Sequence, residues 1–420
     1  MHPHRRLTCF LVLLLAAAAG VARAQGGFAL HDGDRVVFYG DSITDQRLYT
    51  TFVEDYVVTR FPQMKVGFIH SGWGGDRVTG GGGGPVDLRL QRDVITYKPS
   101  VMTVMLGMND GSYRAFDPHI FDTYASGYQH IVEAVKAALP HIRLTLIQPS
   151  PFDDVTRAPN FEGGYNAVLV RYGQFVKELA EKQGASVADL NTPVVSALQK
   201  AKALDADQAQ KIVPDRVHPG ASGHLVMAAA LLKAWNAPPT VTAVAIDAAS
   251  PRVARQENTH VTELRDSSSL SWAEKDEALP MPLDLNDPVL KLALQASDVV
   301  EALDQELLQV TGLAAPRYTL KIDDQEVGSF TREQLADGIN LALLPTPMLK
   351  QAQAVHGLTV NHNNLHFARW RQVQVPLQEH SLSHLRNALK ALDDLEGDLV
   401  KQQHEAAQPK SHHYELAPQS

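Results

Sequence analysis

The stretch Val36-Val37-Phe38-Tyr39-Gly40-Asp41-Ser42-Ile43-Thr44-Asp45 decides the fold that we predict for this chain. Its four leading apolar residues are typical of a strand that is buried on both faces of a parallel sheet. Gly40 ends this run, and the polar residues that follow can start a helix. Ser42 would then lie where the free N–H groups of a helix N-terminus can receive an anion. The alternative is that Ser42 or Asp41 only caps that helix.

Short apolar runs continue to alternate with longer helical patterns as far as Trp235. Strands that alternate with helices in this way predict an α/β fold with one doubly wound parallel sheet of five strands and helices on both faces. Ligands of such sheets bind beyond the carboxyl ends of the strands. The predicted strands are Val36–Tyr39, Val66–His70, Val101–Leu106, Leu144–Ile147 and Ser186–Leu190, and the predicted helices are Leu48–Phe61, Leu88–Tyr97, Ile120–Leu139, Asn166–Gln183 and Ala221–Ala234.

The segment Asp215-Arg216-Val217-His218 can supply the two partners that a nucleophilic serine requires. The carboxylate of such a pair orients the imidazole and stabilises its cation, while the other ring nitrogen accepts the serine proton. An Asp-x-x-His pair is by itself more often an ordinary surface loop. This pair, however, follows the fifth predicted strand of a sheet whose first strand ends in a serine. We therefore predict a catalytic triad of Ser42, His218 and Asp215.

Two further segments can supply N–H donors for the oxyanion that develops during acyl transfer. Gly107-Met108-Asn109-Asp110 follows the third predicted strand, and Ser71-Gly72-Trp73-Gly74-Gly75-Asp76 follows the second. The Asn109 amide would reach the same crevice, and a glycine allows a backbone N–H to approach the substrate closely. Each segment alone could be a turn, since Gly and Asn are common turn residues. Four such segments, all at strand carboxyl ends, favour one shared site.

With these four blocks, residues 34–235 resemble the SGNH (GDSL-type) hydrolase family, which is named for its Ser, Gly, Asn and His blocks. The resemblance implies a flavodoxin-like three-layer sandwich and a serine esterase that works through an acyl-enzyme. Nothing in the sequence demands a cofactor or a metal. The resemblance implies Ser42 as nucleophile, Asp215 and His218 as the rest of the triad, and Ser42, Gly75 and Asn109 as the oxyanion hole, with Gly72 and Gly74 as alternatives to Gly75.

Aromatic and polar residues beside these segments bear on the natural substrate. Trp73 and Tyr113 fall in loops next to the oxyanion segments, and aromatic rings with polar neighbours suit a sugar. We therefore expect a carbohydrate O-acetyl ester, on a small molecule or a polysaccharide. A lysophospholipase-like or general short-chain esterase is the alternative within the enzymes, and a catalytically silent sugar-binding or interaction protein is the alternative of another class. The residues expected to contact substrate are Asp41, Trp73, Asp110 and Arg157.

Charge and the N-terminus bear on partners and location. The chain of 420 residues has 38 Lys and Arg against 47 Asp and Glu, and its net charge of -9 disfavours nucleic acid as a partner. Arg5 and Arg6, the apolar run 7–21 and Ala22-Arg23-Ala24 predict a signal peptide over residues 1–24, cleavage after Ala24, and a secreted or periplasmic protein. The alternative is a membrane anchor, for which the run is short. Cys9 is the only cysteine, so the mature chain would contain no disulfide, and we expect no stable membrane insertion after cleavage.

The sequence changes in character after Pro239, so we divide it into a hydrolase domain (25–239) and a smaller, mixed helical and hairpin region (240–400). Leu290–Val310 and Ser381–Val400 have the pattern of amphipathic helices, and Tyr318–Ser329 that of a hairpin. This hairpin is too small to be stable alone, so we expect the region to pack on the hydrolase core as an accessory. A separate small domain is the alternative. Residues 401–420 are polar and predicted to be a disordered tail.

Overall fold

The structure is a computed structural model that describes residues 27–380 and 382–419. A five-stranded parallel sheet forms the centre of the domain before Pro239, with the strands in the order β2-β1-β5-β6-β7. This is the strand order of a doubly wound sheet, and it confirms the predicted fold class. The strands are β1 (Arg35–Gly40), β2 (Gly67–Gly72), β5 (Val101–Met105), β6 (Arg143–Ile147) and β7 (Ser186–Ala188), and each overlaps the strand predicted at its place.

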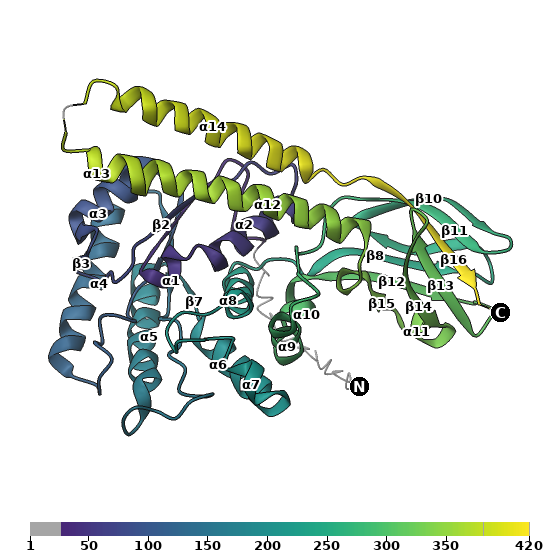
Figure 1. Cartoon of the computed structure of the whole chain (residues 1–420), viewed down its shortest axis with the longest axis horizontal. Coiled ribbons are helices and arrows are strands. Elements are labelled where there is room, and N and C mark those ends of the chain that lie inside the picture. The colour runs from purple at the N-terminus through teal and green to yellow at the C-terminus, as the bar shows by residue number, and fades with distance from the viewer. Residues whose placement is uncertain (1–26, 381, 420) are drawn as a thin grey trace, which may run out of the picture.

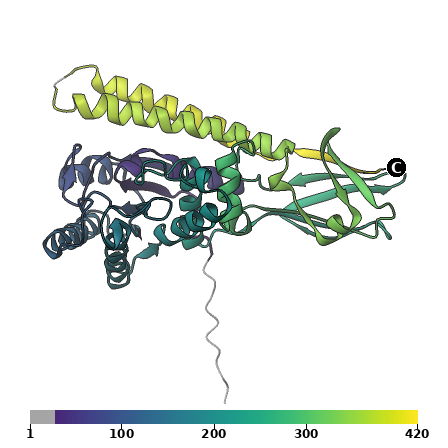
Figure 2. The same ribbon diagram turned by 60° about the horizontal axis from the view of Figure 1, so that its bottom comes forward.

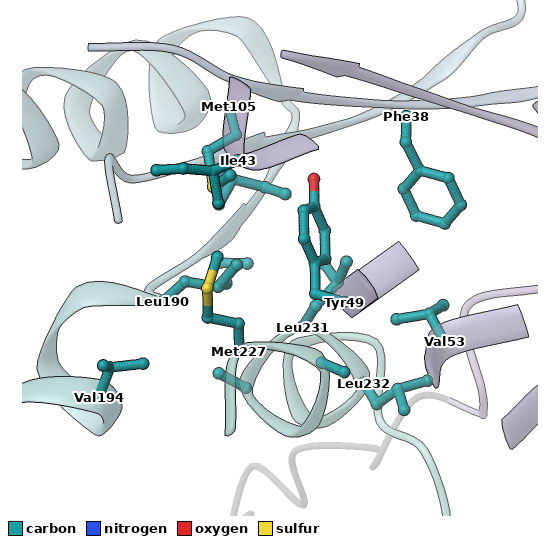
Figure 3. Packing of buried hydrophobic residues seen from close by; sticks show 14 of the residues in the cluster. Phe38, Ile43, Tyr49, Val53, Met105, Leu190, Val194, Met227, Leu231 and Leu232 are labelled. Atoms are coloured by element: carbon teal, nitrogen blue, oxygen red, sulfur yellow. The ribbon is translucent and has the colours of Figure 1, made fainter. Parts of the chain in front are cut away.

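Helices cover both faces of the sheet (Figure 1). On one face α8 (Ala221–Ala234) contacts both α2 (Leu48–Arg60) and α6 (Asn191–Leu204), and on the other lie α3 (Val86–Asp93), α4 (Pro118–Ala138) and α5 (Gly164–Gln183). Figure 3 shows the interior of the first of these layers, where Phe38 of the sheet, Tyr49 of α2 and Leu231 of α8 belong to one buried cluster. α6 and the short α7 (Ala206–Ala209) are missing from the helices predicted above.

The chain beyond Pro239 forms two further sheets at one end of the molecule (Figure 2). They enclose a hydrophobic core of their own, which includes Trp272, Leu320 and Leu416. One sheet has the order β10-β11-β16-β13-β14 and the other β15-β12-β8-β9. Their bounds are β8 (Thr240–Asp247), β9 (Arg252–Glu257), β10 (Thr259–Asp266), β11 (Leu270–Asp276), β12 (Gln305–Thr311), β13 (Arg317–Ile322), β14 (Gln325–Thr331), β15 (Ile339–Asn340) and β16 (Ser411–Pro418).

Two predictions for this region are wrong. The expected helix Leu290–Val310 is split into α9 (Pro288–Ala296), α10 (Val299–Leu303) and the strand β12, because buried and exposed residues alternate along β12. The expected disordered tail is a helix end followed by β16, which pairs with both β11 and β13. Tyr414 and Leu416 lie on one buried face of β16, and this apolar face holds the segment in the sheet.

A long helical hairpin connects the two parts of the molecule. It consists of α12 (Pro347–Phe367), a π-helical segment (Ala368–Gln374), α13 (Val375–Leu377) and α14 (Leu385–Ala406). α12 and α14 contact each other and run along the parallel-sheet domain, where α12 packs on α2 (Figures 1 and 2). The region after Pro239 thus has its own core and also lies on the parallel-sheet domain.

Buried charges attach this hairpin to α2. His362 of α12 donates to Glu54 of α2 at 3.0 Å and to Glu396 of α14 at 3.1 Å, and Gln403 donates to Glu54 at 2.9 Å. Burial alone would lower the pKa of His362, but the two carboxylates raise that pKa to about 10. Burial is likewise outweighed at Glu396, where hydrogen bonds from His362 and His366 lower the pKa to about 2. At neutral pH a cation between two carboxylates therefore joins three helices.

No helix within the described residues is both long and apolar enough to cross a membrane. Among the same described residues, no group of three or more His, Cys, Asp or Glu side chains is placed so that it could hold a metal ion. The predicted signal peptide (1–24), with Cys9, lies outside the described residues.

Candidate active site

Ser42 is the first residue of α1 (Ser42–Asp45) and lies two residues after the carboxyl end of β1 at Gly40. Asp41 caps this turn, because its Oδ1 accepts the backbone N–H of Ile43 at 3.0 Å. The Oγ of Ser42 lies 2.7 Å from Nε2 of His218. The first N–H groups of a helix have no acceptor within it, so the N–H of Ser42 remains for a ligand.

His218 and Asp215 lie together in the loop before α8. Oδ2 of Asp215 is 2.7 Å from Nδ1 of His218, and Oδ1 accepts the backbone N–H groups of Val217 and His218 at 2.9 and 2.7 Å. Partial burial opposes ionisation of this carboxyl, but the hydrogen bonds from His218 and Val217 outweigh it and lower the pKa of Asp215. The ionised carboxylate thus fixes the imidazole with Nε2 toward Ser42.

Arg216 lies between Asp215 and His218 in the chain and gives this loop an unusual conformation. Its φ of 73° is in the left-handed region that non-glycine residues rarely adopt. Nη1 donates to Asn160 at 3.0 Å, and the guanidinium lies over the ring of Phe152. Backbone strain of this kind persists where surrounding contacts enforce it, so the loop is held rather than free.

Asn109 and Gly75 lie beyond the ends of β5 and β2. Nδ2 of Asn109 donates one hydrogen to the carbonyl of Asp76 at 3.0 Å, and Oη of Tyr113 donates to Oδ1 of Asn109 at 3.0 Å. These bonds fix the amide and leave its second N–H for a ligand. Gly75 has a φ of 77°, which favours glycine, and its N–H has no acceptor among the described residues.

The neighbouring glycines are engaged in other contacts. The N–H of Gly74 donates to the carboxylate of Asp45 at 3.2 Å. Gly72 lies within β2, and a Cβ there would come within 2.1 Å of the backbone nitrogen of Asp45. Gly72 therefore permits close packing of α1 on β2, and Gly75 is the glycine of the three whose N–H suits the oxyanion.

This arrangement is suited to acyl transfer. His218 can accept the proton of Ser42 as Oγ attacks a carbonyl carbon, and Asp215 stabilises the imidazolium that results. The N–H groups of Ser42, Gly75 and Asn109 are the donors available to the oxyanion.

Sequence reasoning missed Arg89 of α3, which anchors the loop that carries Gly75. Its buried guanidinium donates to Oδ2 of Asp76 and to the carbonyl of Ser71, both at 2.8 Å, and it pairs with Asp93. Arg89 and Asp93 are four residues apart, but such i,i+4 pairs are common on exposed helix faces. The sequence therefore gives no signal that singles out this pair as buried.

Two of the four residues expected to contact substrate are buried acids with other partners. Burial raises the pKa of Asp41, the helix cap, to about 7. Burial also raises the pKa of Asp110 to about 6, and Oδ1 of Asp110 accepts the N–H of Val78 at 2.9 Å. Asp110 thus braces the loop after β2, and neither carboxyl is open to a substrate.

The other two residues expected to contact substrate also have partners within the protein. Trp73 is buried beneath the helical hairpin, where Trp370 packs edge-on at 5.8 Å and Arg371 lies over the ring. Arg157 donates to the carbonyls of Val213 and Pro214 at 3.0 and 2.7 Å, so it supports the loop that leads to Asp215. An aromatic ring that is open beside the site is Tyr113, which is 43% exposed.

Comparison with known proteins places this site in a family. Residues 38–226, which include the four blocks, match the model of the GDSL-like Lipase/Acylhydrolase family. This part of the chain belongs to that family. The protein is accordingly a GDSL-type hydrolase that acts on ester bonds.

Relatives of this esterase extend the comparison. The chain is 24% identical over 223 residues to an acetylxylan esterase of Geobacillus stearothermophilus, an alignment that covers 48% of this chain and 93% of the relative. A solved structure of a gut microbial diltiazem-metabolizing enzyme has a TM-score of 0.80 and 25% identity, and the match covers 94% of this chain and all of that one. The likeness in structure thus includes the region after Pro239. The solved structure of the acetylxylan esterase Axe2 from Geobacillus stearothermophilus has a TM-score of 0.40 and 23% identity, over 50% of this chain and 96% of that one.

Proposed function

We propose that the protein hydrolyses carbohydrate O-acetyl esters through an acyl-enzyme formed on Ser42. The observation that carries this proposal is the chain from Asp215 through His218 to Ser42, in which both side-chain contacts are 2.7 Å. In the first step the Ser42 Oγ–carbonyl bond forms, His218 takes the serine proton, and the same proton passes to the departing sugar oxygen. In the second step His218 takes a proton from water, which attacks the acyl carbon, and the acid leaves as Ser42 recovers its proton.

The open setting of the triad supports a large substrate with a small acyl group. The side chains of His218 and Asp215 are 33% and 55% exposed, so a polymer can reach them. Tyr113 presents an exposed ring whose hydroxyl contacts Asn109, and such a ring can stack on a sugar. The relative from Geobacillus stearothermophilus is named an acetylxylan esterase. A lysophospholipase-like or short-chain esterase remains the second candidate.

The first experiment tests the enzyme class. Purified protein should hydrolyse p-nitrophenyl acetate and react with a fluorophosphonate probe, whereas Ser42→Ala should do neither and should keep its melting temperature. Ser126→Ala, which removes an exposed hydroxyl on α4, is the matched control and should behave as the wild type. Full activity in Ser42→Ala would remove Ser42 as nucleophile, and an inactive wild type would favour the sugar-binding alternative.

The second experiment tests the substrate. Hydrolysis rates should fall from p-nitrophenyl acetate to the butyrate and octanoate esters, and acetate should be released from acetylated xylan or pectin. A preference for the octanoate, or release of fatty acid from lysophosphatidylcholine, would favour the lysophospholipase-like candidate instead.

Export from the cytoplasm is a further part of the proposal. It rests on the charged start, apolar run and Ala22-Arg23-Ala24 of the sequence. Sequencing the N-terminus of protein recovered from the periplasm or the medium should show a chain that begins at Gln25. A chain that retains residues 1–24 in the membrane fraction would indicate an anchor.

A further inference from the structure

The π-helical segment of the hairpin lies over the loop that carries Gly75. The wider turn of a π-helix is rare and often occurs at functional sites. Two consecutive residues of this segment contact the ring of Trp73, with Trp370 packed edge-on at an interplanar angle of 80° and Arg371 above the ring. Trp73 is two residues before Gly75, so this contact touches the oxyanion loop directly.

A continuous chain of hydrogen bonds also leads from Trp370 to Asn109. Nε1 of Trp370 donates to Oδ1 of Asp93 at 2.7 Å, and Oδ2 of Asp93 pairs with Nη1 of Arg89. Nε of Arg89 donates to Oδ2 of Asp76 at 2.8 Å, and the carbonyl of Asp76 accepts Nδ2 of Asn109 at 3.0 Å. The chain thus begins on the helical hairpin and ends on a proposed oxyanion donor.

Burial and charge make this chain stiff. Trp370, Asp93, Arg89 and Asp76 are all buried, so each polar contact is made away from water, where an unpaired group is costly. Arg92 also donates to both oxygens of Asp93, at 2.6 and 2.8 Å, so two arginines balance two aspartates. The indole N–H therefore completes the set of donors around Asp93.

A second contact holds the hairpin near the start of the site. The guanidinium of Arg47 lies 4.4 Å from the ring centre of Phe367, and it donates to Asn364 at 3.2 Å. Arg47 lies two residues after the end of α1, and Asp45 of α1 accepts the N–H of Gly74. The hairpin consequently contacts the chain beside two of the three proposed oxyanion donors, Ser42 and Gly75.

We propose that Trp370 is a positioning residue for the oxyanion hole, which it sets through Asp93, Arg89 and Asp76. The proposal rests on the proposed function and extends it to the region after Pro239. The helical hairpin then completes the geometry of the reaction without touching the substrate, because it fixes the loop of Gly75 and the amide of Asn109.

Replacement of Trp370 by Phe tests the proposal, since it removes the N–H and keeps most of the packing. Trp272→Phe is the matched control, because Nε1 of this buried residue donates to Glu274 at 2.9 Å far from the site, in the second core. Trp370→Phe should lower kcat by about threefold to thirtyfold, the range for residues that act through others, with KM nearly unchanged. Equal kcat values for the two variants would overturn the proposal.

Two further measurements separate positioning from general loosening. Asn109→Ala should lower kcat by about 10²–10³-fold, and Trp370→Phe should cost less in this background than in the wild type, because part of its effect passes through the Asn109 amide. Multiplication of the two effects would show that Trp370 does not act through Asn109. Hydrogen exchange of the amides of residues 71–80 should rise in Trp370→Phe and not in Trp272→Phe. This result does not depend on activity, so unchanged exchange overturns the inference even if the proposed reaction proves wrong.

Discussion

The two regions of this molecule differ in how far apart along the chain their contacting segments lie. In the parallel-sheet domain every strand is followed by a helix that packs back on the sheet, and the site residues come from the strand ends. In the region after Pro239, β16 lies between β11 and β13, so its partners are roughly a hundred residues or more away. We infer that the first region carries the chemistry and that the second region supports the first. Three changes can test this division of roles.

The largest effect should come from the triad carboxylate. Asp215→Asn should lower kcat/KM by roughly 10⁴, as the same replacement does in serine proteases, because the amide favours the wrong imidazole tautomer. Its melting temperature should stay close to that of the wild type. Asp394→Asn on α14, which removes an exposed carboxylate paired with Lys390, is the control and should leave the rate unchanged. If kcat/KM fell by less than about tenfold instead of roughly 10⁴, Asp215 would have only a minor role beside a Ser42–His218 pair.

A smaller effect, on stability alone, should come from the second core. Leu416 of β16 is fully buried, so Leu416→Ala should lower the free energy of unfolding by about 2–5 kcal/mol. Leu395→Ala on α14 is the control, because it removes a side chain that is 53% exposed. It should change the free energy of unfolding by less than about 0.5 kcal/mol. Thermal and urea unfolding measure both variants. If Leu416→Ala also lowered kcat at 25 °C, the division of roles between the two regions would be wrong.

The smallest effect should be a change in how stability depends on pH. Because the folded pKa of His362 is raised to about 10, its contribution is complete below its ordinary pKa of 6.5 and is lost as the pH rises toward 10. Glu396, with a pKa near 2, loses its contribution only as the pH falls below its ordinary 4.5. His362→Gln should therefore be most destabilised near pH 5–6 relative to the wild type.

The difference between wild type and His362→Gln should then narrow by about 1 kcal/mol per pH unit above pH 6.5. Urea titrations at pH 6, 7, 8 and 9 measure this slope. A constant difference for His362→Gln would mean that His362 is neutral in the folded protein.

The sequence predicts the parallel-sheet domain well because its signals are local. Buried strands such as Val101–Met105 are continuous apolar runs, and Ser42, Asn109 and the Asp215–His218 pair follow strand ends that a parallel sheet brings together. Directions of side chains are not local: Trp73 follows β2 as expected but lies under Trp370, which is almost 300 residues later in the chain. The contacts of Asp110 and Arg157 could not be predicted for the same reason, because their partners come from other loops.

In the second region a strand pattern lies inside a segment for which the sequence predicts a helix. Along β12 the residues Glu306, Leu308 and Val310 are buried and alternate with exposed neighbours, which is the period of a strand. β16 shows the same period at His412, Tyr414 and Leu416 within a polar stretch. Only the pairing with β11 and β13 makes such weak alternation decisive, and pairing at this distance cannot be inferred from the segment itself.

The central place of β16 also affects the order in which the protein can fold during synthesis. Strand β13 ends at Ile322, whereas β16 begins at Ser411, 89 residues later. At translation rates of about 5–20 residues per second, this interval is roughly 4–18 s. Until then β11 and β13 have unpaired edges that face each other across a missing strand, and such edges readily pair with another chain. The nascent chain therefore has a period in which it is most exposed to aggregation, when its catalytic half is already complete.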